Sequence, residues 1–385
     1  MSAVARVLRL ALVGGGPGSF IGPVHRMAAE LDGRIRLVAG AFSSDHDRCV
    51  EAGTRFGVAE DRCYADWRDM IVRERERPDG IDMVAIATPN HLHYPVAVAA
   101  LEAGLHVMSD KPATASLEEA VALGRIAADA KARYALSYTY TGYPAVRAAR
   151  TWLAEGRLGN VRKVVVEYIQ GWLSTPLEAR GDKQASWRVD PVRAGLGGCI
   201  ADIGVHAFNI AEFVTGRRVE QLSSELVSTV AGRKLDDDCT ILLRFGGGAT
   251  GVLLASQVAT GARNGLRLRV WGDKGGLTWD HEQPDRLELD WPDGTSQTLR
   301  AGAGGPAGIG ARLPVGHPEG YIGAFATLYR DFADVVTGLS PATLLQGIDE
   351  GIRGMAFIET SVRSNGRGWT RFMPADGTVR GARAE

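Results

Sequence analysis

At 385 residues the chain is longer than one hydrophobic core usually supports, so two domains are expected. A hydrophobic content of 45% and a charged content of 23% are those of an ordinary globular protein. A formal net charge of −1 gives no basic field for nucleic acid or an anionic membrane, and no apolar run approaches the roughly 20 residues that span a bilayer. These values argue against nucleic acid and membranes as partners and favour a small-molecule ligand.

The first third of the chain alternates apolar strands with amphipathic helices. Its opening residues are interpreted as the first strand and not as a signal peptide, because two arginines interrupt the apolar stretch. Strands are predicted at 9–13, 36–42, 82–87, 106–109 and 133–138, and helices at 21–31, at 95–103 and from Ser116. Repeated strand–helix units predict a doubly wound parallel sheet of the Rossmann type, which we assign to residues 1–135.

The pattern changes after about residue 145. Strands are predicted at 161–169, 238–245, 250–258 and 265–271, helices at 202–214 and 323–337, and a loop at 301–316. This arrangement predicts an α+β domain over residues 136–385, with an open, mainly antiparallel sheet and helices on one face.

A glycine-rich turn follows the first predicted strand. Gly14, Gly16 and Gly22 give G-x-G-x5-G, which is the dinucleotide fingerprint G-x-G-x-x-G with three extra residues. In that interpretation Gly14 permits the tight turn, Gly16 lets the backbone approach the diphosphate, and Gly22 allows close helix packing. The alternative is a plain strand-to-helix turn. The residues between them that are expected to contact the cofactor are Gly18, Ser19, Phe20 and Ile21.

The end of the second predicted strand lacks the acid that usually binds the adenosine ribose. The segment reads Phe-Ser-Ser-Asp, so that Ser43 and Ser44 are left to bind a ribose hydroxyl or a 2′-phosphate, with Arg48 near enough to assist the latter. NAD or NADP is therefore predicted, with NAD preferred.

Three residues are predicted to carry the chemistry. Asp202 and His206 are four residues apart and project from one face of a helix. An imidazole with an ordinary pKa near 6.5 suits a general base, and Asp202 either orients that ring or binds a neighbouring hydroxyl. Lys111, between a strand and a proline, is placed to donate to the reacting hydroxyl.

In this order along one chain, these motifs resemble those of the Gfo/Idh/MocA family (glucose–fructose oxidoreductase, inositol dehydrogenase, rhizopine catabolism). Residues 87–90 with His93 resemble the family's T-P-N…H segment, residues 198–206 resemble its G-G…D-x-G-x-H stretch, and Asp110-Lys111-Pro112 stands where the family has E-K-P. The resemblance implies an NAD(P)-dependent dehydrogenase of a secondary hydroxyl on a cyclic polyol, sugar or glycoside. It also implies cofactor contacts from Thr88, Pro89, Asn90, His93, Asp110 and Lys111.

A narrower resemblance concerns the members that act on inositols, sugars or glycosides. It rests on Trp187, Arg188 and His317, which are expected to contact substrate together with Lys111, Asp202 and His206. The family resemblance further implies that the open sheet face packs against another subunit, giving a homodimer or homotetramer. A cis Lys111–Pro112 bond is expected, because it would turn the lysine compactly from its strand toward the nicotinamide.

Two alternatives remain open from sequence. The first is a glycosidase that oxidises transiently, eliminates and reduces again with bound NAD. The second is a non-catalytic nucleotide-binding regulator, although retention of the three predicted catalytic residues argues against it. No metal site is predicted, since His91 and His93 have no nearby third ligand, and four scattered cysteines without a C-x-x-C pair favour a reducing cytoplasm.

Overall fold

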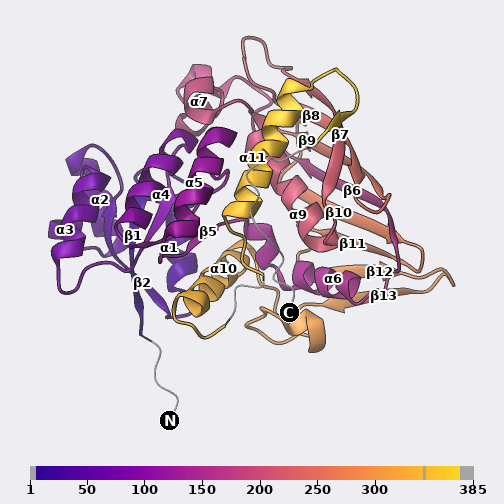
Figure 1. Ribbon diagram of the computed structural model, residues 1–385, viewed down its shortest axis with the longest axis horizontal. Helices are drawn as coiled ribbons and strands as arrows, with labels where there is room; N and C mark the ends of the chain where they lie inside the picture. Colours follow the sequence, from indigo (N-terminus) through magenta and orange to yellow (C-terminus); the bar gives the residue numbers. More distant parts are fainter. Residues whose placement is uncertain (1–5, 341–343, 373–385) are drawn as a thin grey trace.

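The structure, a computed structural model, describes residues 6–340 and 344–372 and contains two sheets that lie side by side (Figure 1). The first sheet has five strands in the order β2-β1-β3-β4-β5, all parallel. The strands are β1 (Leu8–Gly14), β2 (Ile35–Ala41), β3 (Met83–Ala87), β4 (His106–Ser109) and β5 (Tyr134–Leu136). All residues of β3 are buried, as expected for a parallel strand with helices on both faces. The predicted Rossmann sheet is confirmed.

Five helices cover this sheet. They are α1 (Ile21–Glu30), α2 (His46–Phe56), α3 (Trp67–Glu76), α4 (His93–Glu102) and α5 (Leu117–Asp129). Ser116 caps α5, because its hydroxyl accepts a hydrogen bond from the Glu119 amide at 3.2 Å. Helices α2 and α3 were not predicted. Each begins after an aspartate cap, a signal that was present in the sequence.

The second sheet has nine strands in the order β13-β12-β11-β10-β6-β9-β8-β7-β14. Their bounds are β6 (Val161–Ile169), β7 (Val219–Val227), β8 (Asp238–Phe245), β9 (Thr250–Ser256), β10 (Gly265–Gly272), β11 (Gly276–Asp280), β12 (Arg286–Asp290), β13 (Ser296–Arg300) and β14 (Thr370–Arg371). The pair β6–β9 is parallel and the other pairs are antiparallel. The mainly antiparallel sheet is therefore confirmed, with one parallel pair and five strands that the sequence did not reveal.

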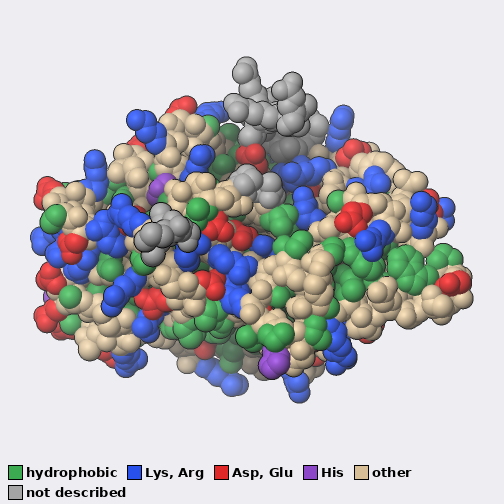
Figure 2. All heavy atoms as spheres, turned by 90° about the horizontal axis from the view of Figure 1, so that it is seen from below, with side chains coloured by type: hydrophobic (Ala, Val, Ile, Leu, Met, Phe, Trp, Pro, Cys, Tyr) green, Lys and Arg blue, Asp and Glu red, His purple; other side chains and the backbone are tan. Residues whose placement is uncertain are grey.

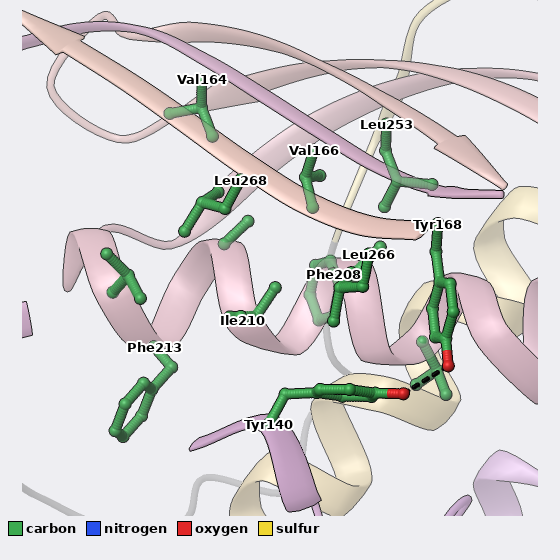
Figure 3. Close-up of a cluster of buried hydrophobic side chains, with 14 of the residues drawn as sticks. Tyr140, Val164, Val166, Tyr168, Phe208, Ile210, Phe213, Leu253, Leu266 and Leu268 are labelled. Carbon is green, nitrogen blue, oxygen red and sulfur yellow. Dashed lines mark hydrogen bonds between the residues drawn. The ribbon is translucent and has the colours of Figure 1, made fainter. Parts of the chain in front are cut away.

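Helices cover one face of this second sheet (Figure 1). They include α6 (Pro144–Ala154), α9 (Val205–Thr215) and α11 (Ile348–Arg363), of which only α9 was predicted. Figure 3 shows α9 beneath the sheet, with Phe208 and Ile210 directed toward the valines and leucines of β6, β9 and β10. The predicted loop at 301–316 contains one short 3₁₀ turn, Gly305–Gly308.

Helix α10 (Tyr321–Val336) follows that loop and packs against α1 of the first sheet's layer. Phe325, Tyr329 and Phe332 are fully buried in the same hydrophobic cluster as Leu10 and Val24. The chain passes from the first sheet to the second after about residue 135. Helix α10 nevertheless returns to complete the layer of helices on the first sheet. We propose the division at about residue 135 for the sheets, with α10 belonging structurally to the first unit.

One face of the molecule mixes both signs of charge. Figure 2 shows lysine and arginine side chains interspersed with acidic ones over the face seen from below. No helix among residues 6–340 and 344–372 is long and apolar enough to cross a membrane.

Candidate active site

A cleft of about 1200 Å³ lies between the two halves of the molecule. Its nucleotide half is lined by the glycine turn after β1 and by the ends of β2 and β3. Its other half is lined by Lys111, Asp202 and His206, together with aromatic residues of the second sheet. The three predicted catalytic residues thus meet in one place, at the carboxyl ends of the parallel strands, where such sheets bind ligands.

The glycine turn has the backbone that its sequence predicted. Gly14 has φ +84°, and a Cβ on Gly22 would lie 2.3 Å from the Gly15 Cα, so the turn packs directly on α1. The structure adds a second reason for glycine at position 16. Its absent Cβ would lie 2.3 Å from the carbonyl oxygen of Phe42, so this position is small because the end of β2 presses against it.

Most of the predicted cofactor residues line the cleft: Gly14, Gly16, Ser19, Phe20, Ile21, Ser43, Ser44, Thr88, Pro89, Asn90, Asp110 and Lys111. The Thr88 hydroxyl is buried without a hydrogen-bond partner among the described residues. A buried, unpartnered hydroxyl in a cleft is what a bound ligand with polar groups would satisfy. The volume, the glycine turn and this hydroxyl all fit a dinucleotide.

Three predicted cofactor residues lie outside the cleft lining. Arg48 is exposed on α2, where Asp45, the displaced acid of this strand end, caps the helix. The buried His93 ring bridges the carbonyl oxygens of Thr88 and Pro112, at 2.9 Å and 2.7 Å. It therefore holds two cleft-lining segments together and does not face the cavity. Gly18 meets a helix of the second half through its carbonyl oxygen.

Lys111 lies directly after β4, and its peptide bond to Pro112 is cis, which confirms that prediction. Its Nζ atom donates to the main-chain oxygen of Asp202 and lies 3.3 Å from the Asp202 carboxylate. Asp110 holds the turn itself, since its carboxylate accepts from the Lys111 amide at 2.8 Å and from the Ser137 hydroxyl at 2.9 Å. The short acid in place of the family's glutamate thus positions the lysine.

Asp202 lies in a π-helical turn, Ile200–Gly204, that precedes α9, so the helix predicted to start at residue 202 starts differently. Such turns are frequent at functional sites. The carboxylate accepts from Arg188 at 3.0 Å and from the Gln257 amide at 2.7 Å, in addition to Lys111. Burial alone would raise the Asp202 pKa, but Arg188, Lys111 and Gln257 hold it below its ordinary value. No hydrogen bond joins the Asp202 carboxylate to the His206 ring, and its contacts are instead to Lys111, Arg188 and Gln257.

His206 lies in the first turn of α9 and is only 8% exposed. Its ring packs edge-on against Tyr138 and Tyr140, with centroids at 5.9 Å and 4.9 Å, and no described residue hydrogen-bonds to it. Burial, reinforced by the positive charge of Lys111, lowers its pKa well below the ordinary value. The imidazole is therefore neutral at physiological pH and able to accept a proton.

A buried carboxylate that the sequence analysis missed fixes this segment. Asp236, two residues before β8, accepts from the amides of Gly198 and Ile200, both at 2.7 Å, at the start of the π-helical turn. Burial raises its pKa to about 6. A run of three consecutive aspartates after a loop was the only sequence signal for it.

A network of hydrogen-bonded side chains lines the cleft beside His206. The hydroxyls of Tyr140 and Tyr168 are hydrogen-bonded to each other, as Figure 3 shows, and Tyr168 donates to Asn264 at 2.8 Å. The Asn264 oxygen also accepts from the amide of Gln170 at 2.6 Å, and Gln170 in turn accepts from the Trp172 indole at 3.1 Å. Tyr168, Gln170, Trp172, Asn264 and His281 were missed, because they stand on or next to three strands, of which β6 is far in the sequence from β10 and β11.

The residues predicted to bind substrate are divided between two places. Arg188 and Trp187 line the cleft, and the Arg188 guanidinium lies 4.3 Å from the Trp187 ring centroid and 5.6 Å from that of Trp172. His317 is exposed and lies outside the cleft lining, with its ring nitrogen 3.3 Å from the Pro314 oxygen. The structure of one chain therefore does not bring His317 to the site.

Comparison with known proteins identifies the fold. Residues 8–138 match the oxidoreductase family with an NAD-binding Rossmann fold, and residues 146–278 match the GFO/IDH/MocA C-terminal domain. The chain belongs to the Gfo/Idh/MocA family. It is an oxidoreductase family member with an NAD-binding domain, which sets aside the non-catalytic regulator.

Three relatives of this Gfo/Idh/MocA protein show how far the similarity extends. The uncharacterized oxidoreductase YfiI of Bacillus subtilis is 31% identical, over 96% of this chain and 98% of its own. Levoglucosan dehydrogenase of Pseudarthrobacter phenanthrenivorans is 28% identical, over 73% of this chain and 76% of its own. The crystal structure of an inositol dehydrogenase homolog from Azotobacter vinelandii with NAD⁺ is 37% identical, with a TM-score of 0.91 over 96% and 98% of the two chains.

Proposed function

We propose that this oxidoreductase is a dehydrogenase that removes a hydride from a secondary hydroxyl-bearing carbon of a cyclic polyol, sugar or glycoside. One observation carries the proposal: Lys111, Asp202 and the neutral His206 line the same part of the cleft. The other part of that cleft fits a dinucleotide. The relatives support the substrate class, since one is named for levoglucosan and the Azotobacter homolog was also crystallised with NADH and myo-inositol.

The roles proposed for the side chains follow from their surroundings. When bound, the nicotinamide accepts the hydride. His206, which is buried and neutral, takes the hydroxyl proton as the carbonyl forms. Lys111 donates to the oxygen on which negative charge develops, and the ionised Asp202 fixes the ammonium group through its carboxylate and main-chain oxygen. Asp202 is thereby a residue that positions both Lys111 and Arg188.

The lining of the substrate half suits a hydroxylated ring. Tyr140, Tyr168, Trp172 and Trp187 present aromatic faces, while Gln170, Asn264 and His281 supply donors and acceptors between them. Ligand sites of this kind combine apolar walls with a few placed polar groups. A ring with C–H faces and many hydroxyls matches both features.

The test is a panel of inositols, hexoses and glycosides, assayed for NADH formation with NAD and for NADPH formation with NADP. Net reduction of the cofactor by one ring class is the expected result. Cleavage of a glycoside without net reduction would identify instead the glycosidase that oxidises transiently. No turnover of any of the compounds, by a protein that binds NAD, would count against the proposed substrate class.

We further propose that the outer face of the nine-stranded sheet packs against another copy of the chain in a homodimer or homotetramer. Leu242 on β8 and Trp271 on β10 are 44% and 38% exposed on strands whose alternate residues are buried. Open sheets that leave apolar side chains exposed are commonly covered by a partner. Light scattering at micromolar concentration tests this, and a monomer would contradict it.

We also propose a cytoplasmic location. The four cysteines are free and buried, which is compatible with a reducing compartment. Fractionation of cells that produce the protein with a small tag would test this, and recovery outside the cytoplasmic fraction would contradict it.

A further inference from the structure

The short segment of residues 182–195, which we call the clamp, belongs to the second half of the chain but lies against the nucleotide half. It contains α7 (Lys183–Arg188) and α8 (Pro191–Ala194). Figure 1 shows α7 close to the upper ends of the helices that cover the first sheet. Arg188 in the clamp contacts Asp202, so the segment reaches both ends of the cleft.

One end of the clamp meets the residues inserted into the glycine turn. The Lys183 Nζ atom donates to the Pro17 carbonyl oxygen at 3.1 Å, and the Gln184 amide donates to the Gly18 oxygen at 3.0 Å. Both acceptors belong to the stretch that lengthens G-x-G-x-x-G to G-x-G-x5-G. The insertion therefore provides the turn with two carbonyls for a helix of the other half.

The other end of the clamp meets the segments that follow β3 and β4. The Asn90 amide donates to the Ala194 oxygen at 2.8 Å. Gly195 has φ +94°, and a Cβ there would lie 2.7 Å from the Ala115 oxygen. The clamp thus contacts the segments that follow β1, β3 and β4, and Lys183 and Arg193 line the cavity from it.

Three basic side chains gather in this region: those of Lys183, Arg193 and Arg48. Among the described residues, no carboxylate lies within 4.0 Å of the side chains of Lys183, Arg193 or Arg48. Burial, followed by the charges of Arg48 and Arg193, lowers the pKa of Lys183, which places the three cations in one another's field. Like charges gathered without an acid repel one another, and a bound anion relieves that repulsion.

We propose that Lys183 and Arg193 bind the diphosphate of the dinucleotide from the substrate half of the molecule. The glycine turn at the start of α1 is where such sheets hold a diphosphate, and Lys183 is hydrogen-bonded to that turn. Lys183 has two further N–H donors, and no described residue accepts from them. The assignment rests on the family's NAD binding and not on the identity of the substrate.

The test is calorimetric titration of the full-length chain with NAD, ADP-ribose and adenosine, without substrate. Lys183→Met keeps most of the apolar stem and removes the charge. NAD and ADP-ribose should each bind about 10- to 100-fold more weakly, because a charge-assisted hydrogen bond is lost, while adenosine should bind within about twofold of the parent. Arg193→Met should act in the same direction, and Lys183→Arg should restore most of the affinity.

Lys131→Met is the matched control, because Lys131 is exposed and lies outside the cleft lining. The affinity of this variant for NAD should equal that of the parent. A parallel titration with NADP distinguishes contact with the diphosphate, which NAD and NADP share, from contact with the 2′-phosphate, which only NADP carries. If Lys183→Met lowers the affinity for NADP but not for NAD, the lysine binds a 2′-phosphate and the proposal fails. It fails also if adenosine loses as much affinity as NAD, or if a folded Lys183→Met binds all ligands normally.

Discussion

His25 in α1 and Tyr329 in α10 meet in the core, where the Nδ1 atom of the imidazole lies 2.6 Å from the phenolic oxygen. The two residues are 304 positions apart in the chain and both are buried. The second ring nitrogen of His25 has no partner among the described residues. Burial lowers the His25 pKa to about 4. This pair joins the last helix of the nucleotide layer to its first.

The first prediction follows from that pKa. Because the folded value lies below the unfolded value of about 6.5, the contribution of His25 to stability is present above pH 6.5 and is lost as the pH falls toward 4. In the double variant His25→Phe/Tyr329→Phe this loss should be absent. Urea unfolding at pH 7.5 and pH 4.5 should show a smaller decline for the variant, by on the order of 2 kcal/mol. Equal declines would contradict the prediction.

The second prediction concerns His206 as the base. Its lowered pKa means that the neutral form persists below pH 6.5, so the acid limb of kcat/KM should lie below that value. His206→Ala should lower kcat about 10²- to 10⁴-fold, with little change in NAD affinity. Added imidazole should restore part of the rate, because the vacated site is in the cleft. Near-native kcat in the alanine variant would remove His206 from the mechanism.

The third prediction concerns Lys111. Lys111→Met removes the donor aimed at the developing alkoxide and should reduce kcat at least as much as His206→Ala. It also leaves the Asp202 carboxylate with Arg188 and Gln257 only. Steady-state kinetics with the best substrate, together with NAD titration, separates the effects. Lys131→Met serves as the control, and a variant that loses NAD binding instead of rate would reassign Lys111 to the cofactor.

The fourth prediction separates positioning from chemistry at Asp202. Asp202→Asn retains the shape of the side chain but weakens its hold on Lys111 and Arg188. We expect KM to rise and kcat to fall together, since orientation of the donor and of the substrate half both suffer. A change confined to KM would indicate that Asp202 only binds substrate.

The fifth prediction uses the contact between Gly16 and the end of β2. A methyl group there would meet the Phe42 carbonyl, so Gly16→Ala should lower the free energy of unfolding by about 1–3 kcal/mol. The same variant should also bind NAD more weakly. Gly308→Ala is the control, because nothing lies within 4 Å of its added Cβ. Weaker NAD binding with unchanged stability would favour the original idea that a side chain meets the diphosphate.

The sequence predicted the first sheet closely because β1 to β4 are apolar runs ended by glycine, serine or threonine. It placed Lys111, Asp202 and His206 in one site because several motifs follow one another along the chain in the order of a known family. The spacing within any one motif would not have brought Lys111 to the other two residues. It missed the Asn264 and Gln170 network, since those contacts depend on the pairing of β6 with β10. The π-helical turn at Asp202 was equally hidden, because its helical spacing fitted an ordinary helix start.

The placement of α10 bears on how the protein is made. The nucleotide-binding layer closes over α1 only when residues 321–336 arrive, although its five strands are complete by Leu136. During synthesis, the apolar side of α1 remains uncovered while residues 137–320, nearly half of the chain, are translated before α10 begins. A fragment that stops after the fifth strand would therefore expose that side and tend to aggregate, so binding studies need a chain that includes α10.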